Sequence, residues 1–533
     1  MALTNLLVNV YASQYTLTIS GLPQKLTVQK EGKNLPVEIK RQEKGTLVTV
    51  DFTEPVVGKG ERLVFELSYE IEGIAKKKGQ IWEINLPRLT ESEEVNTYEV
   101  ILVVPENFGL PAILKPRALR ETREGGYRSY FFDKKDLAAN GGAVNAVFGN
   151  FQIFDFTMDY QLENIFKQRA VAEIVLPPET VWQKVIYQRL EPEPERVRVD
   201  EDGNWLAKYE LAAEQKLKVA VAGQALIFAE PQEEYRRLLI EPGITNWQEQ
   251  KFWPVNDGLI KEKSQKLKTI KDIYDFVVRE LNYDFDRVGQ KAERLGAKQV
   301  LLKQNKAVCL EFADLFVTLA RAAKIPAREV EGYAFTDNPQ LKPLGLVTDI
   351  LHAWPEFWDG EKKLWRPVDP TWEKTTGGVD FFSKTDLNHF AFVIHGQNSE
   401  RPFLEGKNIK VNYGSNFGTM PEPEIEVKVV VPDKLVERKD QSVKIVLKNI
   451  GGVAKYNYRV NLKMEGREED RVAKMLPPRA QEIWEIPWKT EIGWKRQKKR
   501  LEIVADSKNY DRMITIGSHF DSWIYRVRRF FDR

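Results

Sequence analysis

The sequence predicts a multidomain protein in which two β-rich regions flank a central α+β domain. The first observation is hydrophobic alternation with a period of two, typical of half-buried strands, which runs through the first ~240 residues and returns after about residue 420. The second is a helical period that begins between those regions. The third is length, since 533 residues at ~150 residues per domain fit three or four domains.

The N-terminal part, residues 1–240, is predicted to be a β-sandwich region of one or two sandwiches. Apolar and polar residues alternate over Leu63–Ile71, and short strand-like runs follow at Gln80–Leu86 and Tyr98–Val104. A proline follows each of these two runs and ends strand pairing, because proline lacks the backbone N–H. Short strands with frequent turn signals are typical of a sandwich.

The central domain is predicted over residues 241–415. Two amphipathic helices are expected, over 266–281 and Val308–Lys324, because apolar residues recur there at helical intervals. Pro326 ends the second helix. Three strand-like segments follow, at Arg328–Phe335, His352–Trp358 and Leu364–Val368. Helices followed by strands predict an α+β fold.

The C-terminal part, residues 420–516, is predicted to be an immunoglobulin-like β-sandwich, because two alternating runs are followed by a Gly-Gly turn. The alternating residues are Ile425, Val427, Val429, Val443, Ile445 and Leu447. Residues 517–533 are expected to form an amphipathic tail, with aromatic and arginine side chains at helical spacing. Docking on the protein body and contact with a membrane surface both fit that spacing.

Composition excludes several classes of protein. The 80 Lys and Arg residues nearly balance 78 Asp and Glu residues, so no nucleic-acid partner is expected. A single cysteine excludes an intramolecular disulfide and a cysteine-rich zinc site, and the four histidines have no metal-ligand spacing. We therefore expect neither a metal nor a cofactor. We expect no signal peptide or membrane-spanning segment in this sequence, and the β-rich flanks favour an extracytoplasmic or cell-surface location.

One domain holds a candidate nucleophile, base and orienting carboxylate. Cys309 lies at the predicted start of a helix, where backbone N–H groups and the helix dipole stabilise a thiolate and an oxyanion. His352 opens a predicted strand and could take the thiol proton and return it to a leaving amine. Asp369 follows the next strand and could hold His352 in the useful tautomer.

Each of these residues also has a structural interpretation. A lone cysteine on a helix is usually a small buried hydrophobe, and an aspartate before Pro-Thr is usually a turn or capping residue. A histidine at the start of a strand is more often structural. Trp354 and Trp372 are candidates for the wall of a substrate groove, with core packing as the alternative because tryptophan buries a large area.

Three ordered segments resemble the transglutaminase-like superfamily. Within Ala307–Arg328, a cysteine opens a helix that ends in Arg-Ala-Ala-Lys-Ile-Pro-Ala-Arg, which resembles the nucleophile helix of that family. His352–Trp358 resembles its histidine strand, and Trp365–Thr371 resembles its aspartate strand. The resemblance covers roughly Lys266–Gly378 and implies a papain-like α+β fold.

The resemblance also implies chemistry. Cys309 would be the nucleophile, His352 the base and acid, and Asp369 the orienting group, acting on a peptide or protein amide through a thioester. Water would resolve the thioester in a peptidase or amidase, and an amine would resolve it in a crosslinking transglutaminase. We favour hydrolysis, because prokaryotic members look more protease-like. A catalytically idle binding or scaffold protein at the cell surface is the alternative from another class.

One residue departs from the family pattern. Pro355 stands in the histidine strand, where the family commonly has an ordinary strand residue. Because proline removes a ladder donor, we expect this strand to lie at a sheet edge or to carry a bulge there.

Overall fold

The computed structural model describes the chain in two compact units, Met1–Phe148 and Gly149–Arg533. It describes all residues except 44, 87–94, 140–142, 234–240, 288–292, 335–350, 377–378, 384–385, 416–418, 432–433, 436–441, 465–466, 488–493, 507 and 525–533. Among the described helices, none is both long and apolar enough to cross a membrane.

The first unit contains two groups of strands, each with its own core. The first group comprises β1 (Ala2–Thr4), β2 (Gln14–Ile19), β3 (Gln24–Lys30), β4 (Lys33–Asn34), β5 (Val37–Gln42), β6 (Gly45–Asp51), β7 (Arg62–Val64) and β8 (Glu66–Glu70). Its sheets have the orders β2-β6-β5 and β4-β3-β8, with β1 paired to β7. Buried residues alternate along β6, where Val48 and Val50 enter the core, as period-two patterning requires.

The second group of the first unit follows the same pattern. It comprises β9 (Ala75–Lys78), β10 (Ile81–Leu86), β11 (Glu99–Pro105), η1 (Glu106–Phe108), β12 (Pro111–Lys115), β13 (Arg120–Glu124), β14 (Tyr127–Asp133), α1 (Lys134–Ala139) and β15 (Val144–Phe148). The sheet orders are β12-β15-β10-β9 and β11-β14-β13. Tyr130 and Phe132 of β14 and Phe148 of β15 lie in one core.

The second unit begins with another pair of sheets. Its strands are β16 (Phe151–Glu163), β17 (Ala170–Leu176), β18 (Gln183–Glu191), β19 (Arg196–Val199), β20 (Trp205–Leu211) and β21 (Lys216–Phe228). The sheet orders are β18-β21-β16-β26 and β17-β20-β19, so β26 (Lys407–Tyr413) returns from beyond the central domain to pair with β16. The predicted limits of 1–240, 241–415, 420–516 and 517–533 stay predictions.

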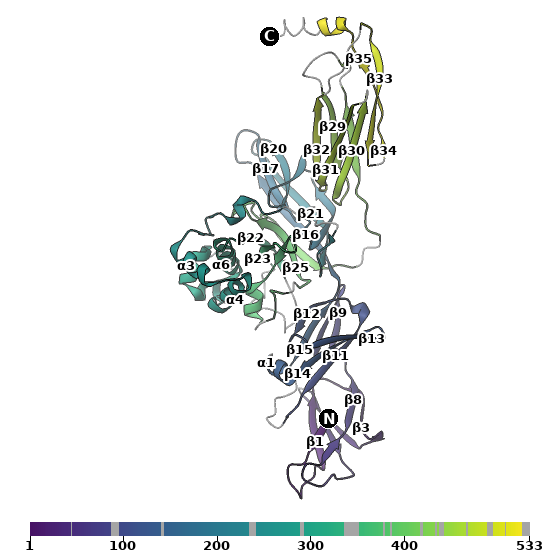
Figure 1. The fold of residues 1–533 in the computed structure, drawn as a ribbon, viewed down its shortest axis with the longest axis vertical. Helices are drawn as coiled ribbons and strands as arrows, with labels where there is room; N and C mark the ends of the chain where they lie inside the picture. Colours follow the sequence, from purple (N-terminus) through teal and green to yellow (C-terminus); the bar gives the residue numbers. More distant parts are fainter. Residues whose placement is uncertain are drawn as a thin grey trace. The chain divides into compact units, whose positions relative to one another are not determined.

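The central domain packs helices against a four-stranded sheet of order β24-β23-β22-β25 (Figure 1). The strands are β22 (Ala327–Ala334), β23 (Leu351–Asp359), β24 (Leu364–Pro367) and β25 (His389–His395). The helices are η2 (Ile244–Trp247), α3 (Gly258–Lys266), α4 (Ile270–Glu280), η3 (Phe285–Arg287), α5 (Gly296–Leu302), η4 (Gln304–Lys306), α6 (Cys309–Ala322) and α7 (Pro370–Thr375).

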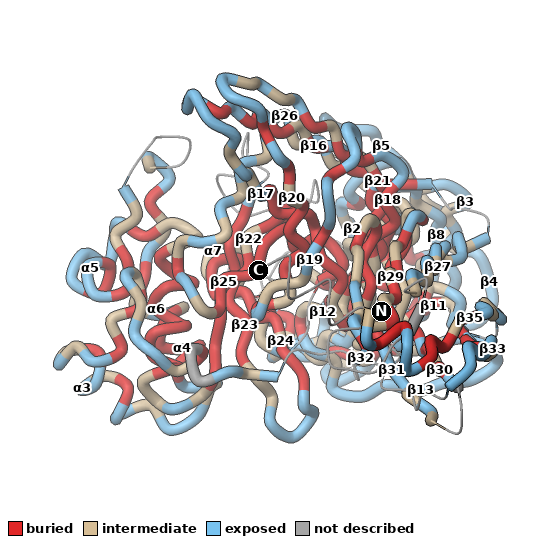
Figure 2. Tube along the Cα trace, turned by 90° about the horizontal axis from the view of Figure 1, so that it is seen from above, coloured by how far each residue is buried: buried red, intermediate tan, exposed pale blue. Residues whose placement is uncertain are grey.

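The α6 helix forms the centre of this domain, because nearly all of its residues are buried (Figure 2). Its side chains Phe312 and Phe316 join Ile273 and Val277 of α4 and Phe357 of β23 in one apolar core. The α4 helix starts at a capping box between Thr269 and Asp272, which satisfies two backbone donors at its first turn.

The C-terminal sandwich packs two sheets around a core of its own. The strands are β27 (Ile425–Val430), β28 (Lys434–Leu435), β29 (Ser442–Asn449), β30 (Lys455–Met464), β31 (Arg467–Leu476), β32 (Gln481–Pro487), β33 (Gln497–Ala505), β34 (Lys508–Asn509) and β35 (Arg512–Ile516). The order β27-β29-β32 faces β28-β35-β33-β30-β31 across a core that includes Val443, Ile445 and Leu462.

The predicted fold class is confirmed, with local differences. In the central domain, the sequence analysis missed the helices α3, α5 and α7 and the strand β25. The α3 helix buries only Ile260 and Ser264, so it has little apolar periodicity. Strand β25 is buried at every residue after His389, so its side chains do not alternate in polarity. Most of the predicted tail lies outside the described residues; residues 519–524 are helical.

The expectation for Pro355 was wrong. Strand β23 lies between β24 and β22, and its register with both neighbours has no bulge. The carbonyl of Pro355 accepts from the N–H of Val368, so the proline nitrogen points to the same side, toward β24. Strand pairing with β24 ends at Glu356 opposite Pro367, so the missing N–H removes no donor from that register.

Candidate functional site

Cys309 is the first residue of α6 and is half-buried. The chain is fixed just before it, because the Glu311 carboxylate accepts from the N–H of Val308 and from the N–H of Leu295, each at 2.9 Å. Arg287 forms an ion pair with the same carboxylate at 3.4 Å. The thiol therefore sits at the start of a firmly held helix, where the first N–H groups have no intrahelical acceptor.

His352 lies in β23, opposite Gly332 of β22, and is 5% exposed. Its Nε2 lies 2.8 Å from Oδ2 of Asp369, and Cys309 lies near enough to the ring to help raise its pKa. Because Nε2 is engaged with Asp369, Nδ1 is the ring nitrogen left for the thiol. The structure thus brings together the three residues predicted for the triad; their catalytic roles stay a prediction.

Asp369 is the N-cap residue of α7, which follows β24 directly. Its Oδ1 accepts from the N–H of Trp372 at 2.9 Å, while Oδ2 faces the imidazole of His352. Burial alone would raise the pKa of Asp369, but the charges and hydrogen bonds of His352 and His389 lower it to about 2. Asp369 is therefore an anion at neutral pH.

The charge of Asp369 controls the protonation of His352. Burial alone would lower the pKa of His352, but Asp369 and, to a smaller extent, Cys309 raise it to about 9. His352 is consequently a cation beside Cys309 at neutral pH.

Trp354 and Trp372 are buried, with exposed fractions of 4% and 1%. Their rings pack around the histidines: the centroid of His352 lies 6.0 Å from that of Trp354 and 5.8 Å from that of Trp372. Trp354 also lines a pocket, described below. The role predicted for these tryptophans in substrate binding stays a prediction.

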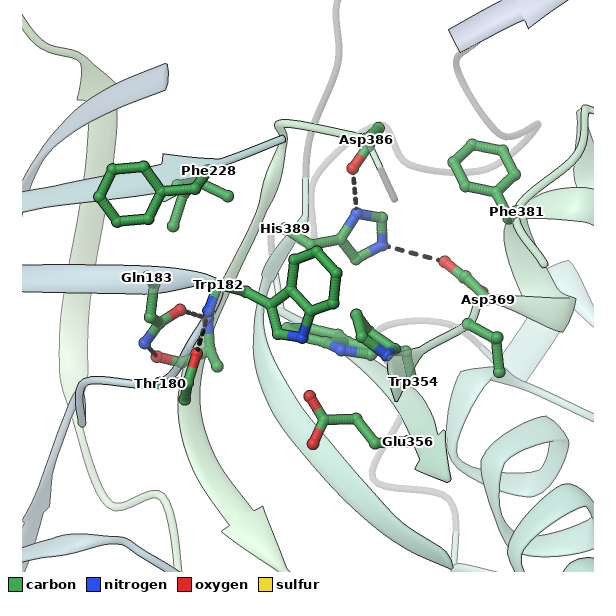
Figure 3. Close-up of a pocket in the computed structure, with 14 residues that line it drawn as sticks. Thr180, Trp182, Gln183, Phe228, Trp354, Glu356, Asp369, Phe381, Asp386 and His389 are labelled. Atoms are coloured by element: carbon green, nitrogen blue, oxygen red, sulfur yellow. Dashed lines mark hydrogen bonds and ion pairs between the residues drawn. The ribbon is translucent and has the colours of Figure 1, made fainter. Parts of the chain in front are cut away.

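The sequence analysis missed a second histidine at this site. His389 opens β25, and its Nε2 lies 3.0 Å from the same Oδ2 of Asp369 that His352 contacts. On its other side, Nδ1 of His389 contacts Oδ1 of Asp386 (Figure 3). No local pattern marks His389, because its contact with Asp369 depends on the pairing of β25 with β22.

A narrow pocket of about 40 Å³ adjoins Asp369, Asp386 and His389 (Figure 3). Its wall is otherwise largely apolar and comes from two parts of the unit, the β18–β21 sandwich and the central sheet. The lining residues are Thr180, Trp182, Gln183, Ile227, Phe228, Trp354, Glu356, Pro367, Val368, Asp369, Phe381, Asp386, His389 and Ala391. A space of this size holds a few water molecules and is too small for a peptide side chain of any length.

Two groups of side chains, within the described part of the chain, bring three metal-binding atoms within 4.8 Å of one another. The groups are His352, Asp369 and His389, and Glu329, Glu331 and His395. In the second group, Arg294 forms an ion pair with Glu329 at 2.5 Å and His395 faces Glu331 at 3.3 Å. Because the guanidinium of Arg294 already binds Glu329, this group is a poor site for a divalent ion. The absence of a metal or cofactor stays a prediction.

Comparisons with known proteins agree with this geometry. The family model described as the transglutaminase-like superfamily matches residues 254–370. An uncharacterized protein of Mycobacterium tuberculosis is 30% identical over 112 residues, which cover 20% of this chain and 34% of that protein. A protein-glutamine gamma-glutamyltransferase of Pseudomonas aeruginosa is 37% identical over 82 residues, which cover 15% of this chain and 12% of that enzyme.

Among solved structures, a candidate cysteine protease from Cytophaga hutchinsonii aligns with a TM-score of 0.35 and 16% identity, covering 51% of this chain and 93% of that one. The chain spans about a third of the length of the first curated relatives that it matches. Residues 254–370, which hold Cys309, His352 and Asp369, are the part of this chain that matches the transglutaminase-like superfamily.

Proposed function

We propose that this chain is a cysteine enzyme that acts on peptide or protein amides through a thioester on Cys309. The observation that supports this most directly is the buried ion pair of His352 with Asp369, next to Cys309 at the start of α6. A cationic imidazole beside a sulfur at a helix start is the environment in which a thiolate becomes a strong nucleophile.

Each step can be assigned to an atom. The Cys309 thiolate forms a bond to the amide carbonyl carbon, and the carbonyl oxygen becomes an oxyanion. The backbone N–H of Cys309, at the open first turn of α6, is the candidate donor to that oxyanion. His352 gives its proton to the nitrogen of the leaving amine as the C–N bond breaks, which leaves a thioester and a neutral imidazole.

Hydrolysis completes the proposed cycle. His352, now neutral, takes a proton from water as the water oxygen attacks the thioester carbonyl. The C–S bond then breaks, a carboxylic acid leaves, and the thiolate and imidazolium return together. Asp369 stays ionised throughout and holds the ring by its Nε2. We favour water as the acceptor because half-buried Cys309 is reachable by it without a dedicated acceptor site.

Amine transfer is the second candidate. The P. aeruginosa relative bears the name protein-glutamine gamma-glutamyltransferase, and its similar segment is 37% identical. In that reaction a primary amine, in place of water, attacks the same thioester, and a new amide forms. Cys309, His352 and Asp369 would have the same roles in both reactions.

The test is to incubate the full chain with a glutamine-containing protein, with and without a primary amine. Ammonia or new amino termini without amine incorporation would indicate hydrolysis, and incorporation of the amine would indicate transfer. Cys309→Ser should abolish either product. If iodoacetamide alkylates Cys309 no faster at acidic pH than it alkylates a free thiol of pKa ~8.5, the enzyme proposal is wrong and a scaffold role gains support.

The partner and location belong to the same proposal. The substrate would be a peptide or protein outside the cytoplasm, reached by a chain whose β-rich flanks are typical of surface proteins. Fractionation of the source cells checks the location. Residues 517–533 would dock on the protein body or contact a membrane surface, and a vesicle-binding assay with anionic lipid distinguishes the two.

A further inference from the structure

We infer that His389 and Asp386 form a positioning pair that fixes the Asp369 carboxylate and limits how tightly His352 holds its proton. The inference rests on the proposed function, in which His352 gives that proton to a leaving amine. His389 is a positioning residue here, because it acts on His352 through Asp369.

The first support is the geometry of Asp369. Its Oδ1 accepts from the N–H of Trp372 at 2.9 Å, and its Oδ2 faces two imidazoles, Nε2 of His352 at 2.8 Å and Nε2 of His389 at 3.0 Å. With both oxygens engaged, the carboxylate cannot rotate without losing a contact. His389 therefore fixes the orientation of the group that orients His352.

The second support is the way in which His389 itself is held. Its Nδ1 contacts Oδ1 of Asp386, and that oxygen also accepts from the N–H of Asn388 at 3.1 Å. The side chain of Asp386 is 2% exposed, and Trp372 packs against the imidazole of His389 at 4.7 Å between ring centroids. Contacts with Asp369 and Asp386 at its two nitrogens, and with Trp372 at its ring, thus hold His389 in place.

The third support is charge. Each ring nitrogen of His389 faces a carboxylate, so each must donate a hydrogen, which requires the imidazolium form. Burial alone would lower the pKa of His389, but Asp386 and Asp369 raise it to about 10. Charges therefore alternate from Asp386 through His389 and Asp369 to His352, which faces Cys309.

Other charged groups around His389 are few. The rings of His352, Trp354, Trp372 and Phe381 lie within 4.7 to 6.4 Å of its centroid, and among them only His352 carries a titratable group. Glu356 lines the same pocket but forms an ion pair with Arg328 at 2.6 Å. On α7, the Glu373 carboxylate accepts from the Tyr274 hydroxyl at 2.7 Å, and the Asp369 carbonyl lies 3.0 Å from the same hydroxyl.

The imidazolium of His389, as a second cation beside Oδ2, weakens the electrostatic attraction between Asp369 and the proton of His352. It also repels that proton directly, since the two ring centroids are 5.6 Å apart. Without His389, His352 would hold its proton more tightly and give it less readily to a leaving amine. The pair thus keeps Asp369 in place while preventing it from making His352 too basic.

The test uses nuclear magnetic resonance on the full chain labelled with ¹³Cε1-histidine. The chain has four histidines, so four resonances suffice, each assigned by a single substitution. His389→Gln keeps an N–H donor for Asp369 but removes the cation. We expect the pKa of His352 to rise by about one unit in this variant.

Alkylation gives a second readout. Cys309 is the sole cysteine, so iodoacetamide reports on it alone. The alkylation rate of Cys309 should increase further at the pH where His352 loses its proton. In His389→Gln, this increase should occur at a pH about one unit higher. His389→Leu, which removes both cation and donor, should in addition slow turnover of the full chain by about 10- to 100-fold.

The control is His395→Gln, which removes another buried histidine from the same strand, β25. It should leave the pKa of His352 unchanged. If His389→Gln fails to fold, Asp386→Asn gives a second test, because it removes the carboxylate charge that contributes most to raising the pKa of His389. An unchanged His352 pKa in a folded His389→Gln or Asp386→Asn chain overturns the inference. A wild-type chain with an ordinary Cys309 profile instead overturns the proposed function.

Discussion

His352 and Asp369 form a buried ion pair in which Nε2 and Oδ2 are 2.8 Å apart and each side chain is 4% exposed. Removing Asp369 would leave the cationic imidazole of His352 buried without its carboxylate partner, which is far more costly than losing a surface pair. This pair therefore affects both the reactivity of Cys309 and the stability of the central domain.

Asp369→Asn tests the charge of the Asp369 side chain while keeping its size. The amide keeps the size of the side chain, but burial then lowers the pKa of His352 without the opposing carboxylate, to below its ordinary value near 6.5. By analogy with orienting aspartates in other triads, turnover should fall on the order of 10³- to 10⁴-fold. Steady-state kinetics and the histidine resonances check both effects. Retention of activity within a factor of a few would contradict a triad role for Asp369.

Stability should decrease at alkaline pH. The pKa of His352 is raised from 6.5 to about 9 in the folded chain, so the folded state binds a proton that the unfolded state releases. The resulting stabilisation is fully present below about pH 6.5 and is lost as pH rises through about 9. The shift corresponds to roughly 3 kcal/mol.

Chemical denaturation of the wild-type chain and Asp369→Asn, at several pH values between about 6 and 10, measures this loss. Asp369→Asn should be less stable at neutral pH but show a flatter pH dependence, because it lacks the charge that raises the pKa of His352. A wild-type free energy of unfolding that stays constant over this range would contradict the raised pKa.

Gly332 should tolerate no side chain. It pairs with His352 on one side and Ala391 on the other, and a Cβ there would lie 2.1 Å from the carbonyl oxygen of Phe390. Backbone cannot give way as a flexible side chain does, so Gly332→Ala should force β22 and β25 apart. We expect a loss of several kcal/mol, at the high end for a single substitution, and a displaced His352.

Gly360→Ala is the matched control, because nothing lies within 4 Å of a Cβ at that position. Thermal unfolding of both variants checks the difference. Equal melting temperatures for the two would show that the sheet can accommodate a methyl group beside His352.

Glu311 should be needed for the start of α6. Its buried carboxylate binds the N–H groups of Val308 and Leu295 and pairs with Arg287. Glu311→Ala removes all three contacts and leaves two backbone donors without this acceptor, which should cost about 3 kcal/mol. Glu311→Gln keeps an acceptor oxygen and should cost less.

The reactivity of Cys309 gives a second measurement on the Glu311→Ala variant, in addition to its stability. If the helix start loosens in Glu311→Ala, alkylation of Cys309 at acidic pH should slow toward that of a free thiol. An unchanged alkylation profile in a destabilised Glu311→Ala chain would show that the thiol environment does not depend on this carboxylate.

Local sequence was sufficient to locate the helix of Cys309 and the strand of His352. Helical spacing of buried residues and the start of α6 are properties of neighbouring residues, so α6 lies within one residue of its predicted start. The three segments that resemble the family supplied the link between Cys309, His352 and Asp369, which distance along the chain could not.

Tertiary structure decided the surroundings of that triad. His389 reaches Asp369 because β25 pairs with β22. The pocket beside them is also lined by Trp182, which precedes β18 and donates from its indole N–H to the carbonyl of Trp365, 183 residues later in the chain. Contacts of this kind depend on sheet register and on packing between distant segments, neither of which leaves a periodic pattern in the sequence. The same cause explains Pro355: whether its missing N–H matters depends on where its neighbour in the sheet ends.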